Sequence, residues 1–584
     1  MNDDDATAKP QAATAPGLMS GADYRESLRR SRPRVFVDGR AVESVADEPA
    51  FQPGINAIAL TYDFAREARY APLMTAVERS SGRTVNRMTH LNRSSGDLLN
   101  KLEAVRLICQ ETGCAQRYLT HDALNALAQL AARQDDARGQ PTGGGEASQR
   151  FLDYLHRVQD EDLALGIAMT DAKGDRSRRP HQQGQPDTWV HIVERNAVRN
   201  GRHGIVISGT KAIVTAGPYV HELLVMPSRS MTAADADFAV CCAVPLDAPG
   251  LTLVARPAGR PGERVEHGAP LFSRKYGQST AVCLFDRVFV PWDRVFLDGA
   301  RHGEWEHSSH LTYSYATHHR HSCIGARAGF GDLLIGASAL MIEANGFDPG
   351  AEHHLREQMV ELITITEGFY ACGVAASVYA RSEADGRPQG PVVMPDPVFS
   401  NIGKLLLATK IYDMHRIAHT VSGGLIVTLP GPDEDHNSET AARLSEVLRA
   451  NPEVPYEQRI EAARFIEDLT AGYQGGWYSV ISLHGGGSPA AMKQEIWRHY
   501  PVGSKVDLVE RLLERGVARE GLRADPDRAI TRSRQPGQCC DTGCLPGQSA
   551  SAMASATGPG TGPTMVSLDS VVATLPSREA QRPA

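Results

Sequence analysis

Apolar residues recur at helical spacing near the start of the chain and again over its last third. In residues 98–109 and 123–132 they return every three or four positions, which places them on one face of a helix. The polar, Gly-rich stretch 135–147 is typical of a loop. Further helical patterns cover residues 326–345, 355–380, 397–421, 439–450 and 456–469.

Between residues 185 and 297 the pattern changes to short apolar runs separated by turn residues. These runs occupy residues 204–209, 222–227, 238–244 and 251–255. Short runs rich in Val and Ile and bounded by Gly, Pro or Ser are typical of strands. The pattern therefore predicts a helical region, then a β-rich region, then a second helical region.

These changes of pattern divide the chain into three folded parts and two tails. We expect an N-terminal helical domain at residues 21–165, a middle β-barrel-like domain at 166–300 and a C-terminal helical bundle at 301–521. Residues 1–20 are acidic and then Ala/Pro-rich, while residues 522–584 are rich in Gly, Pro, Ser and Thr. Both tails are predicted to be disordered.

Composition narrows the classes of function. The 584 residues carry a net charge of −8, which argues against nonspecific nucleic-acid binding, because that needs a basic surface. We find no apolar run of roughly 18 residues, so no transmembrane helix is predicted. The N-terminus lacks the basic and then apolar order of a secretory signal, so we expect a cytoplasmic protein.

Ten cysteines in so long a chain do not predict a disulfide framework. Seven of them lie in the folded region, several inside apolar runs, and are expected to be buried free thiols. The other three lie in the C-terminal tail without a nearby histidine, so we predict a disordered extension there and no metal site. These three are Cys539, Cys540 and Cys544.

The richest candidate chemistry lies in the nine residues 168–176, with the sequence AMTDAKGDR. They follow a helix-like segment, residues 160–165, and precede a Pro- and Gln-rich loop. Lys173 and Arg176 are suited to a diphosphate, Thr170 to a polar ring edge, and Gly174 to a close approach of the backbone. By composition alone a charged surface turn explains the segment equally well.

The same segment resembles the flavin-binding loop of a flavoprotein family that includes the large oxygenase component of 4-hydroxyphenylacetate 3-monooxygenase and 4-hydroxybutyryl-CoA dehydratase. The resemblance covers roughly residues 20–515 and includes the motifs at 24–39, 49–63, 285–291 and 484–489. It implies an α+β, acyl-CoA dehydrogenase-like fold with FAD bound where the three domains meet. It also implies a homotetramer.

The resemblance assigns roles to particular residues. Arg117 matches an arginine that touches the substrate, and His319 is a candidate general base. Thr215 is expected to hydrogen-bond the flavin edge near its reactive nitrogen. Without the resemblance, Thr215 would be an ordinary strand threonine and Arg117 a surface ion pair. The implied FAD-binding residues are Ala168, Met169, Thr170, Lys173, Gly174, Asp175, Arg176, Thr215, Arg320, His484 and Gly485.

The dehydratase branch of the family binds a [4Fe-4S] cluster through one histidine and three cysteines. His319 stands at the histidine position and Cys114 at one cysteine position, but Tyr118 and Ala326 stand at the other two. Because such clusters need thiolates, no cluster of the standard kind is predicted. A different ligand set remains open, consisting of Cys109, Cys114, His319 and Cys323.

Departures from both branches leave the substrate less determined than the flavin. Thr280 and Ile481 stand where the dehydratase has glutamates. Ile167 and Ala123 stand where the monooxygenase branch has a histidine and a tyrosine that face the phenol. The neighbouring His121 and Tyr118 are candidates to replace them.

The leading hypothesis is a two-component monooxygenase that hydroxylates a phenol-type substrate with molecular oxygen and reduced FAD. The chain has no G-x-G-x-x-G in a strand-to-helix context, so a separate flavin reductase is expected to supply FADH2. Two alternatives stay open. One is a hydroxyacyl-CoA dehydratase or isomerase that lacks the standard cluster ligands, and the other is a flavin-fold protein that serves as a binding or scaffold subunit.

Overall fold

The computed structural model describes residues 17–260, 272–348, 350–382 and 392–513. All of them belong to one compact unit that spans residues 1–536. The predicted disordered tail at 522–584, with its three cysteines, lies outside the described residues, as does most of the predicted tail at 1–20.

The N-terminal part is built from helices, and two short hairpins interrupt them. Helix α4 shows how the sequence sets a boundary: the Ser94 hydroxyl accepts a hydrogen bond from the Asp97 backbone N–H (3.1 Å) and so caps the first turn. The elements are α1 (Gly21–Arg30), β1 (Arg34–Val37), β2 (Arg40–Ala41), α2 (Gln52–Arg66), α3 (Ala71–Met74), β3 (Thr75–Val77), β4 (Thr84–Asn86), α4 (Ser95–Thr112), α5 (Tyr118–Ala137) and α6 (Glu146–Asp160).

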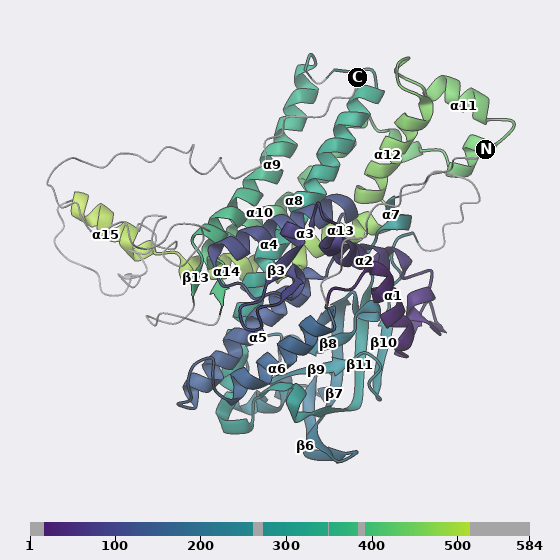
Figure 1. The fold of residues 1–584 in the computed structure, drawn as a ribbon. Coiled ribbons are helices and arrows are strands. Elements are labelled where there is room, and N and C mark those ends of the chain that lie inside the picture. Colours follow the sequence, from purple (N-terminus) through teal and green to yellow (C-terminus); the bar gives the residue numbers. More distant parts are fainter. Residues whose placement is uncertain (1–16, 261–271, 349, 383–391, 514–584) are drawn as a thin grey trace, which may run out of the picture. The chain divides into compact units, whose positions relative to one another are not determined.

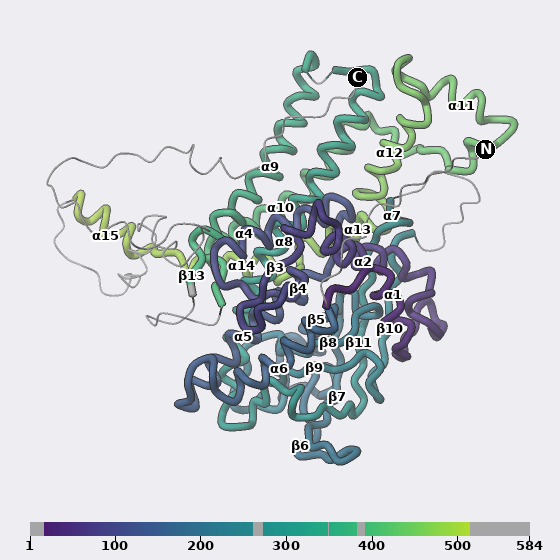
Figure 2. Tube along the Cα trace, in the orientation of Figure 1, coloured from purple at the N-terminus to yellow at the C-terminus, as the bar shows by residue number. Residues whose placement is uncertain are grey.

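The middle part holds the predicted strands, which form two sheets. The larger has the order β2-β1-β10-β11-β7-β6 and the smaller the order β12-β9-β8-β5. Figure 2 shows the β6–β7 hairpin extending from the larger sheet. The elements are β5 (Leu165–Ala168), β6 (His191–Arg199), β7 (Arg202–Thr215), β8 (Glu222–Val225), β9 (Val240–Pro245), β10 (Leu251–Ala255), α7 (Phe272–Lys275), β11 (Thr280–Pro291) and β12 (Val295–Asp298).

Two strands tie the N-terminal part to the sheets. Strand β1 pairs in parallel with β10, so the hairpin that follows α1 completes the larger sheet. Strand β5 pairs in parallel with β8, and all four of its residues are buried. A strand buried on both faces reads as a continuous apolar run. The helix-like interpretation of residues 160–165 was therefore wrong, because α6 ends at Asp160 and β5 begins at Leu165.

Long helices dominate the C-terminal part. Figure 1 shows α9, α10 and α12 lying together, and all three pack against α8. The predicted order of helical, β-rich and helical regions is thus confirmed. The elements are α8 (His307–Ala344), α9 (His353–Val378), β13 (Arg381–Ser382), β14 (Val393–Met394), α10 (Pro397–Val421), α11 (Ala441–Leu448), α12 (Tyr456–Thr470), α13 (Tyr473–His484), α14 (Pro489–His499) and α15 (Val502–Leu512).

Helix α8 begins well before residue 326, where the apolar pattern predicted a helix. Its first half is rich in His, Ser and Thr, which hides the apolar periodicity. These polar residues are nevertheless buried, because α8 packs against α4, α5, α9, α10 and α12. His321, for example, is fully buried and lies 2.8 Å from the Ser377 hydroxyl of α9. A polar helix in the centre of the fold is therefore stabilised by internal hydrogen bonds.

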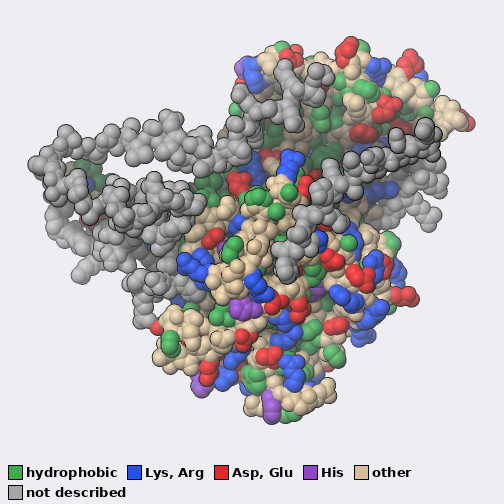
Figure 3. Space-filling view, in the orientation of Figure 1, with side chains coloured by type: hydrophobic (Ala, Val, Ile, Leu, Met, Phe, Trp, Pro, Cys, Tyr) green, Lys and Arg blue, Asp and Glu red, His purple; other side chains and the backbone are tan. Residues whose placement is uncertain are grey.

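Two of the described helices are long and apolar enough, by composition alone, to cross a membrane. They are residues 301–344 and α9. In the first, 67% of the most apolar window is buried inside the protein, as in the core helix of a globular domain. The absence of a transmembrane helix stays a prediction. On the face drawn in Figure 3, acidic and basic side chains are interspersed.

Candidate active site

Helix α8 carries a row of chemically reactive side chains. His319, Cys323 and Arg327 are four positions apart, so they lie along one face of the helix. All three are buried, with 8, 9 and 4% of their surface exposed. His319 Nε2 lies 3.5 Å from Cys323 Sγ.

His319 is held on all sides. Its Nδ1 lies 3.3 Å from an oxygen of Asp122 on α5. The ring stacks on Tyr315, with centroids 5.6 Å apart, and on Tyr118, at 6.1 Å. Burial acts to lower the pKa of His319, but Cys323 and Asp122 outweigh it and raise this pKa to about 9. At neutral pH His319 is therefore protonated and acts first as a hydrogen-bond donor.

Asp122 is itself positioned by a second layer of contacts. It is fully buried and accepts a hydrogen bond from the Ser322 hydroxyl (2.6 Å). The ammonium of Lys101, also fully buried, donates to Ser322 (2.6 Å) and lies 3.4 Å from Asp122. Burial acts to raise the pKa of the Asp122 carboxyl, but Lys101 and the nearby histidines hold it well below its usual range. Asp122 thus stays ionised beneath His319.

The loop between α13 and α14 covers this region. Arg320 donates from Nε to the carbonyl of Gly486 (2.8 Å) and from Nη1 to Asn401 on α10 (2.7 Å). Gly486 has a φ of +76°, and a Cβ there would lie 3.2 Å from the His319 ring. His484 ends α13 and Gly485 follows it. The structure therefore brings Gly486, which follows the predicted residues His484 and Gly485, close to His319 and Arg320.

The predicted flavin loop leaves strand β5 at Ala168 and is fixed at its base. The Lys211 ammonium on β7 lies 2.7 Å from Asp171 and donates to the Met169 carbonyl (2.9 Å). Asp171 also accepts from the backbone N–H of Val190 (3.1 Å). Lys211 and Asp171 are buried, so each charge is stabilised by the other in place of water. Met169 and Thr170 therefore have a defined position.

Beyond Asp171 the loop turns sharply. Lys173 and Gly174 both have positive φ, of 75° and 56°, and the indole N–H of Trp189 donates to the Lys173 carbonyl (3.1 Å). The Asp175 carboxylate accepts a hydrogen bond from the Ser177 hydroxyl (2.7 Å) and pairs with Arg178 (3.2 Å).

Two cations of this loop, Lys173 and Arg176, lie near Arg229 from the segment that follows β8. Among the described residues, Lys173, Arg176 and Arg229 form no ion pair, and burial together with Arg176 and other nearby cations lowers the pKa of Lys173. Such a group fits a diphosphate. The residues present thus fit FAD, the cofactor that the resemblance implies.

Thr215 and Arg117 lie in other surroundings. Thr215 ends β7 opposite Thr280, and its hydroxyl forms no side-chain hydrogen bond among the described residues. Arg117 is buried, donates to the Asp162 carbonyl (2.9 Å) and carboxylate, and lies over the Tyr62 ring at 3.6 Å. Its guanidinium is thus engaged inside the protein, and its contact with a substrate stays a prediction.

The donor set of a [4Fe-4S] cluster is not assembled. The Tyr118 hydroxyl lies 4.0 Å from Cys114 Sγ, which also accepts from Gln116 (3.1 Å). Ala326 is buried and offers no donor atom. Nowhere in the described residues do three or more His, Cys, Asp or Glu side chains form a group that could hold a metal ion. The alternative set of Cys109, Cys114, His319 and Cys323 stays untested, while Tyr118 and Ala326 do not fit the standard cluster.

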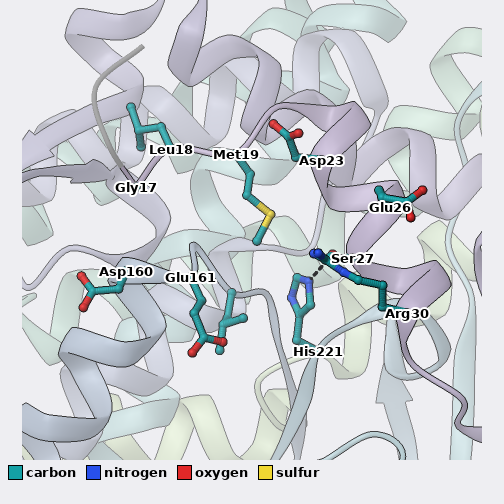
Figure 4. Close-up of a pocket in the computed structure, with 11 residues that line it drawn as sticks. Gly17, Leu18, Met19, Asp23, Glu26, Ser27, Arg30, Asp160, Glu161 and His221 are labelled. Carbon is teal, nitrogen blue, oxygen red and sulfur yellow. Dashed lines mark hydrogen bonds between the residues drawn. The ribbon is translucent and has the colours of Figure 1, made fainter.

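A cavity of about 470 Å³ lies elsewhere, between α1, the end of α6 and the start of β8. In Figure 4 the His221 ring lies beside Ser27, and its Nε2 is 2.8 Å from the hydroxyl. The backbone N–H of Ala164 donates to Nδ1 (2.9 Å), and the Ser27 hydroxyl donates to the Tyr24 carbonyl. Both residues are thus engaged in structural hydrogen bonds.

Sequence reasoning missed the buried partners of the candidate residues. Asp122 and Lys101 interrupt helical apolar patterns, which gives a weak signal of buried charge. Asp171 lies in the predicted flavin loop and Lys211 on the strand that ends at Thr215, but nothing local links them. In each pair the two residues come from different elements that only the fold brings together.

Two family models match almost the whole described chain. They are described as the N-terminal and C-terminal parts of 4-hydroxyphenylacetate 3-hydroxylase and match residues 20–297 and 308–514. The 4-hydroxybutyryl-CoA dehydratase/vinylacetyl-CoA-Δ-isomerase of Clostridium aminobutyricum is 34% identical over 507 residues, 85% of this chain and 99% of that protein. The 4-hydroxyphenylacetate 3-monooxygenase oxygenase component of Thermus thermophilus is 26% identical over 82% of this chain and 94% of that protein.

Solved structures agree with the fold. An oxygen-tolerant 4-hydroxybutyryl-CoA dehydratase from N. maritimus superposes with a TM-score of 0.80 at 33% identity, covering 88% of this chain and 99% of that one. An oxygenase component of 4-hydroxyphenylacetate 3-monooxygenase, complexed with FAD and 4-hydroxyphenylacetate, gives 0.73 at 24% identity, covering 85% and 98%. The predicted acyl-CoA dehydrogenase-like α+β fold is confirmed.

Proposed function

The chain belongs to the 4-hydroxyphenylacetate 3-hydroxylase family, and we propose that it is the oxygenase component of a reduced-FAD-dependent monooxygenase acting on a phenol-type substrate. One observation carries the proposal. Lys173 and Arg176 of the loop after β5, with Arg229 from the segment after β8, fit a flavin diphosphate, while Tyr118 and Ala326 stand where a dehydratase would need thiolates.

The chain's own residues would bind and orient the reactants. Lys173, Arg176 and Arg229 would hold the FAD diphosphate, and the Lys211–Asp171 pair would keep the loop in place. When bound in its reduced form, FAD supplies the activation of molecular oxygen. We expect a separate reductase to supply it.

His319 would act on the phenol oxygen. Asp122 holds its Nδ1, which leaves Nε2, beside Cys323, as the nitrogen that would face a substrate. Because His319 is protonated at neutral pH, it would stabilise a phenolate by donating a hydrogen bond. The rings of Tyr315 and Tyr118, which stack on His319, give this region aromatic surfaces of the kind against which an aromatic substrate packs.

A second candidate function is dehydration or isomerisation of a hydroxyacyl-CoA. It is favoured by the 34% identity to the Clostridium aminobutyricum enzyme over nearly its full length. A protein of this kind would work without the standard cluster ligands, and so through a different chemistry from a cluster-bearing enzyme.

The test compares the two reactions on one preparation. The purified chain is given FAD, an unrelated flavin reductase with NADH, and either 4-hydroxyphenylacetate or 4-nitrophenol in air. Formation of a hydroxylated product supports the monooxygenase. In parallel, 4-hydroxybutyryl-CoA is supplied without oxygen. The proposal would be overturned if 4-hydroxybutyryl-CoA were converted while neither phenol was hydroxylated. It would also be overturned if the anaerobically purified protein contained about four irons per chain.

A further inference from the structure

Cys323 is placed like the nucleophile of a triad. Its Sγ lies 3.5 Å from His319 Nε2, and His319 Nδ1 lies 3.3 Å from Asp122. A nucleophile next to a base that a third group orients is the arrangement of enzymes that use covalent catalysis. We propose that Cys323, His319 and Asp122 form such a triad, and that Cys323 is a modification site for hydrogen peroxide and other soft electrophiles.

The three residues of the triad are held in place by two helices that pack against each other. Cys323 and His319 lie one turn apart on α8, and Asp122 lies on α5, which packs against it. Lys101 and Ser322 hold Asp122. The histidine is therefore oriented toward the sulfur without any movement of the backbone.

Charge favours the reactive form of the sulfur. Burial acts to raise the pKa of Cys323, and Asp122 acts in the same direction, but His319 and Lys404 outweigh them and lower it. Lys404 is a fully buried lysine of α10. The thiolate is the nucleophilic form of cysteine.

The other described cysteines provide a comparison within the same molecule. Cys372 on α9 is more exposed, but its described partner is only the Gly368 carbonyl (3.6 Å), and burial raises its pKa. Cys283 is fully buried in β11 with a raised pKa. The pKa of Cys114 is lowered to about 6 by Cys109 and Arg327, but Cys114 is fully buried and has no histidine beside it. Of these four cysteines, only Cys323 combines a lowered pKa and a neighbouring histidine with some exposed surface, 9% against 0% for Cys114.

The reaction with peroxide balances without a cofactor. The Cys323 thiolate attacks one oxygen, an S–O bond forms and the O–O bond breaks. The departing hydroxide takes the proton of the His319 imidazolium and leaves as water. The sulfur is oxidised to a sulfenic acid and the peroxide is reduced. The inference does not depend on the proposed function, because added hydrogen peroxide suffices.

The first experiment measures alkylation of the native protein by iodoacetamide near pH 7, with peptide mass spectrometry at each cysteine. If exposure alone decided reactivity, Cys372 would react first among the described cysteines. We expect Cys323 to react at least about ten-fold faster. Equal rates, or faster labelling of Cys372, would overturn the proposal. Labelling in urea provides the control, because all cysteines should then react alike.

The second experiment tests the role of the histidine. His319→Gln should slow the labelling of Cys323 to the rate of Cys372, while the matched variant His419→Gln, on α10 and away from the described cysteines, should leave it unchanged. The melting temperature of each variant shows that it folds. With hydrogen peroxide and dimedone, we expect the sulfenic adduct on Cys323, and none in Cys323→Ser. An unchanged rate in a folded His319→Gln protein would contradict the triad.

Discussion

The charges around α8 and those of the loop after β5 are satisfied in opposite ways. Asp122, Lys101 and His319 are buried and partnered by one another and by Ser322. Lys173 and Arg176, in contrast, lie together with Arg229 and form no ion pair among the described residues. A buried charge needs its partner inside the protein, whereas a group of unpaired cations at the surface has room for an anionic ligand. The first region keeps a reactive geometry, and the second offers a binding site.

The loop itself contains both situations. Its base is a buried pair, Asp171 with Lys211, and its outer part carries the cations without partners. A loop fixed at one end presents its outer charges in a defined position, so a ligand does not have to order the whole segment.

The largest effect is expected from removing a charge from the buried group around α8. Asp122→Ala leaves Lys101 buried without a counter-charge, which should cost about 3–5 kcal/mol in the free energy of unfolding. Guanidinium denaturation of the variant and of the wild-type protein measures this difference in the free energy of unfolding. The double variant Lys101→Met/Asp122→Leu, which removes both charges, should recover much of the loss. A loss below about 1 kcal/mol in Asp122→Ala would mean that the two charges are not coupled.

A smaller effect, on FAD affinity, is expected from removing the unpaired cations of the loop after β5. Lys173→Gln and Arg176→Gln should each weaken FAD binding about five-fold, or about 1 kcal/mol, without changing stability. Riboflavin lacks the diphosphate, so its affinity should not change. Titration of both flavins followed by fluorescence measures this. Arg178→Gln is the matched control in the same loop, because Arg178 already pairs with Asp175. Equal losses for FAD and riboflavin would exclude a diphosphate contact.

The smallest effect concerns the cavity of Figure 4. Ser27→Ala removes the hydroxyl beside His221 and should cost about 1 kcal/mol or less. Flavin affinity and phenol hydroxylation should stay as in the wild type. A clear loss of either activity, in a variant of normal stability, would show that this cavity belongs to the functional site.

The sequence predicted much of the fold because periodicity is local. The strands at residues 204–209 and 251–255 and the helix Pro397–Val421 lie where the pattern put them. The early start of α8 was missed because buried histidines do not look apolar. Strand β5 was missed because four residues cannot distinguish a strand from a helix turn.

The candidate site was predictable where it is continuous in sequence. The loop 168–176 and the pair His319–Arg320 are each continuous in sequence, and the resemblance identified both of them. The partners that decide their chemistry come from distant elements, such as Asp122 for His319 and Lys211 for the loop. Since no single segment contains such a pair, only the tertiary structure reveals it.

The 38 residues of α8 also constrain how such a protein can change over evolution. His319, Cys323 and Arg327 follow one another about 6 Å apart along the helix axis. An inserted or deleted residue between them would rotate every side chain that follows it by about 100° around the axis, and so move these side chains off the shared face. New chemistry on this helix is therefore expected to arise by exchanging side chains at fixed positions, and hardly ever by a change of length.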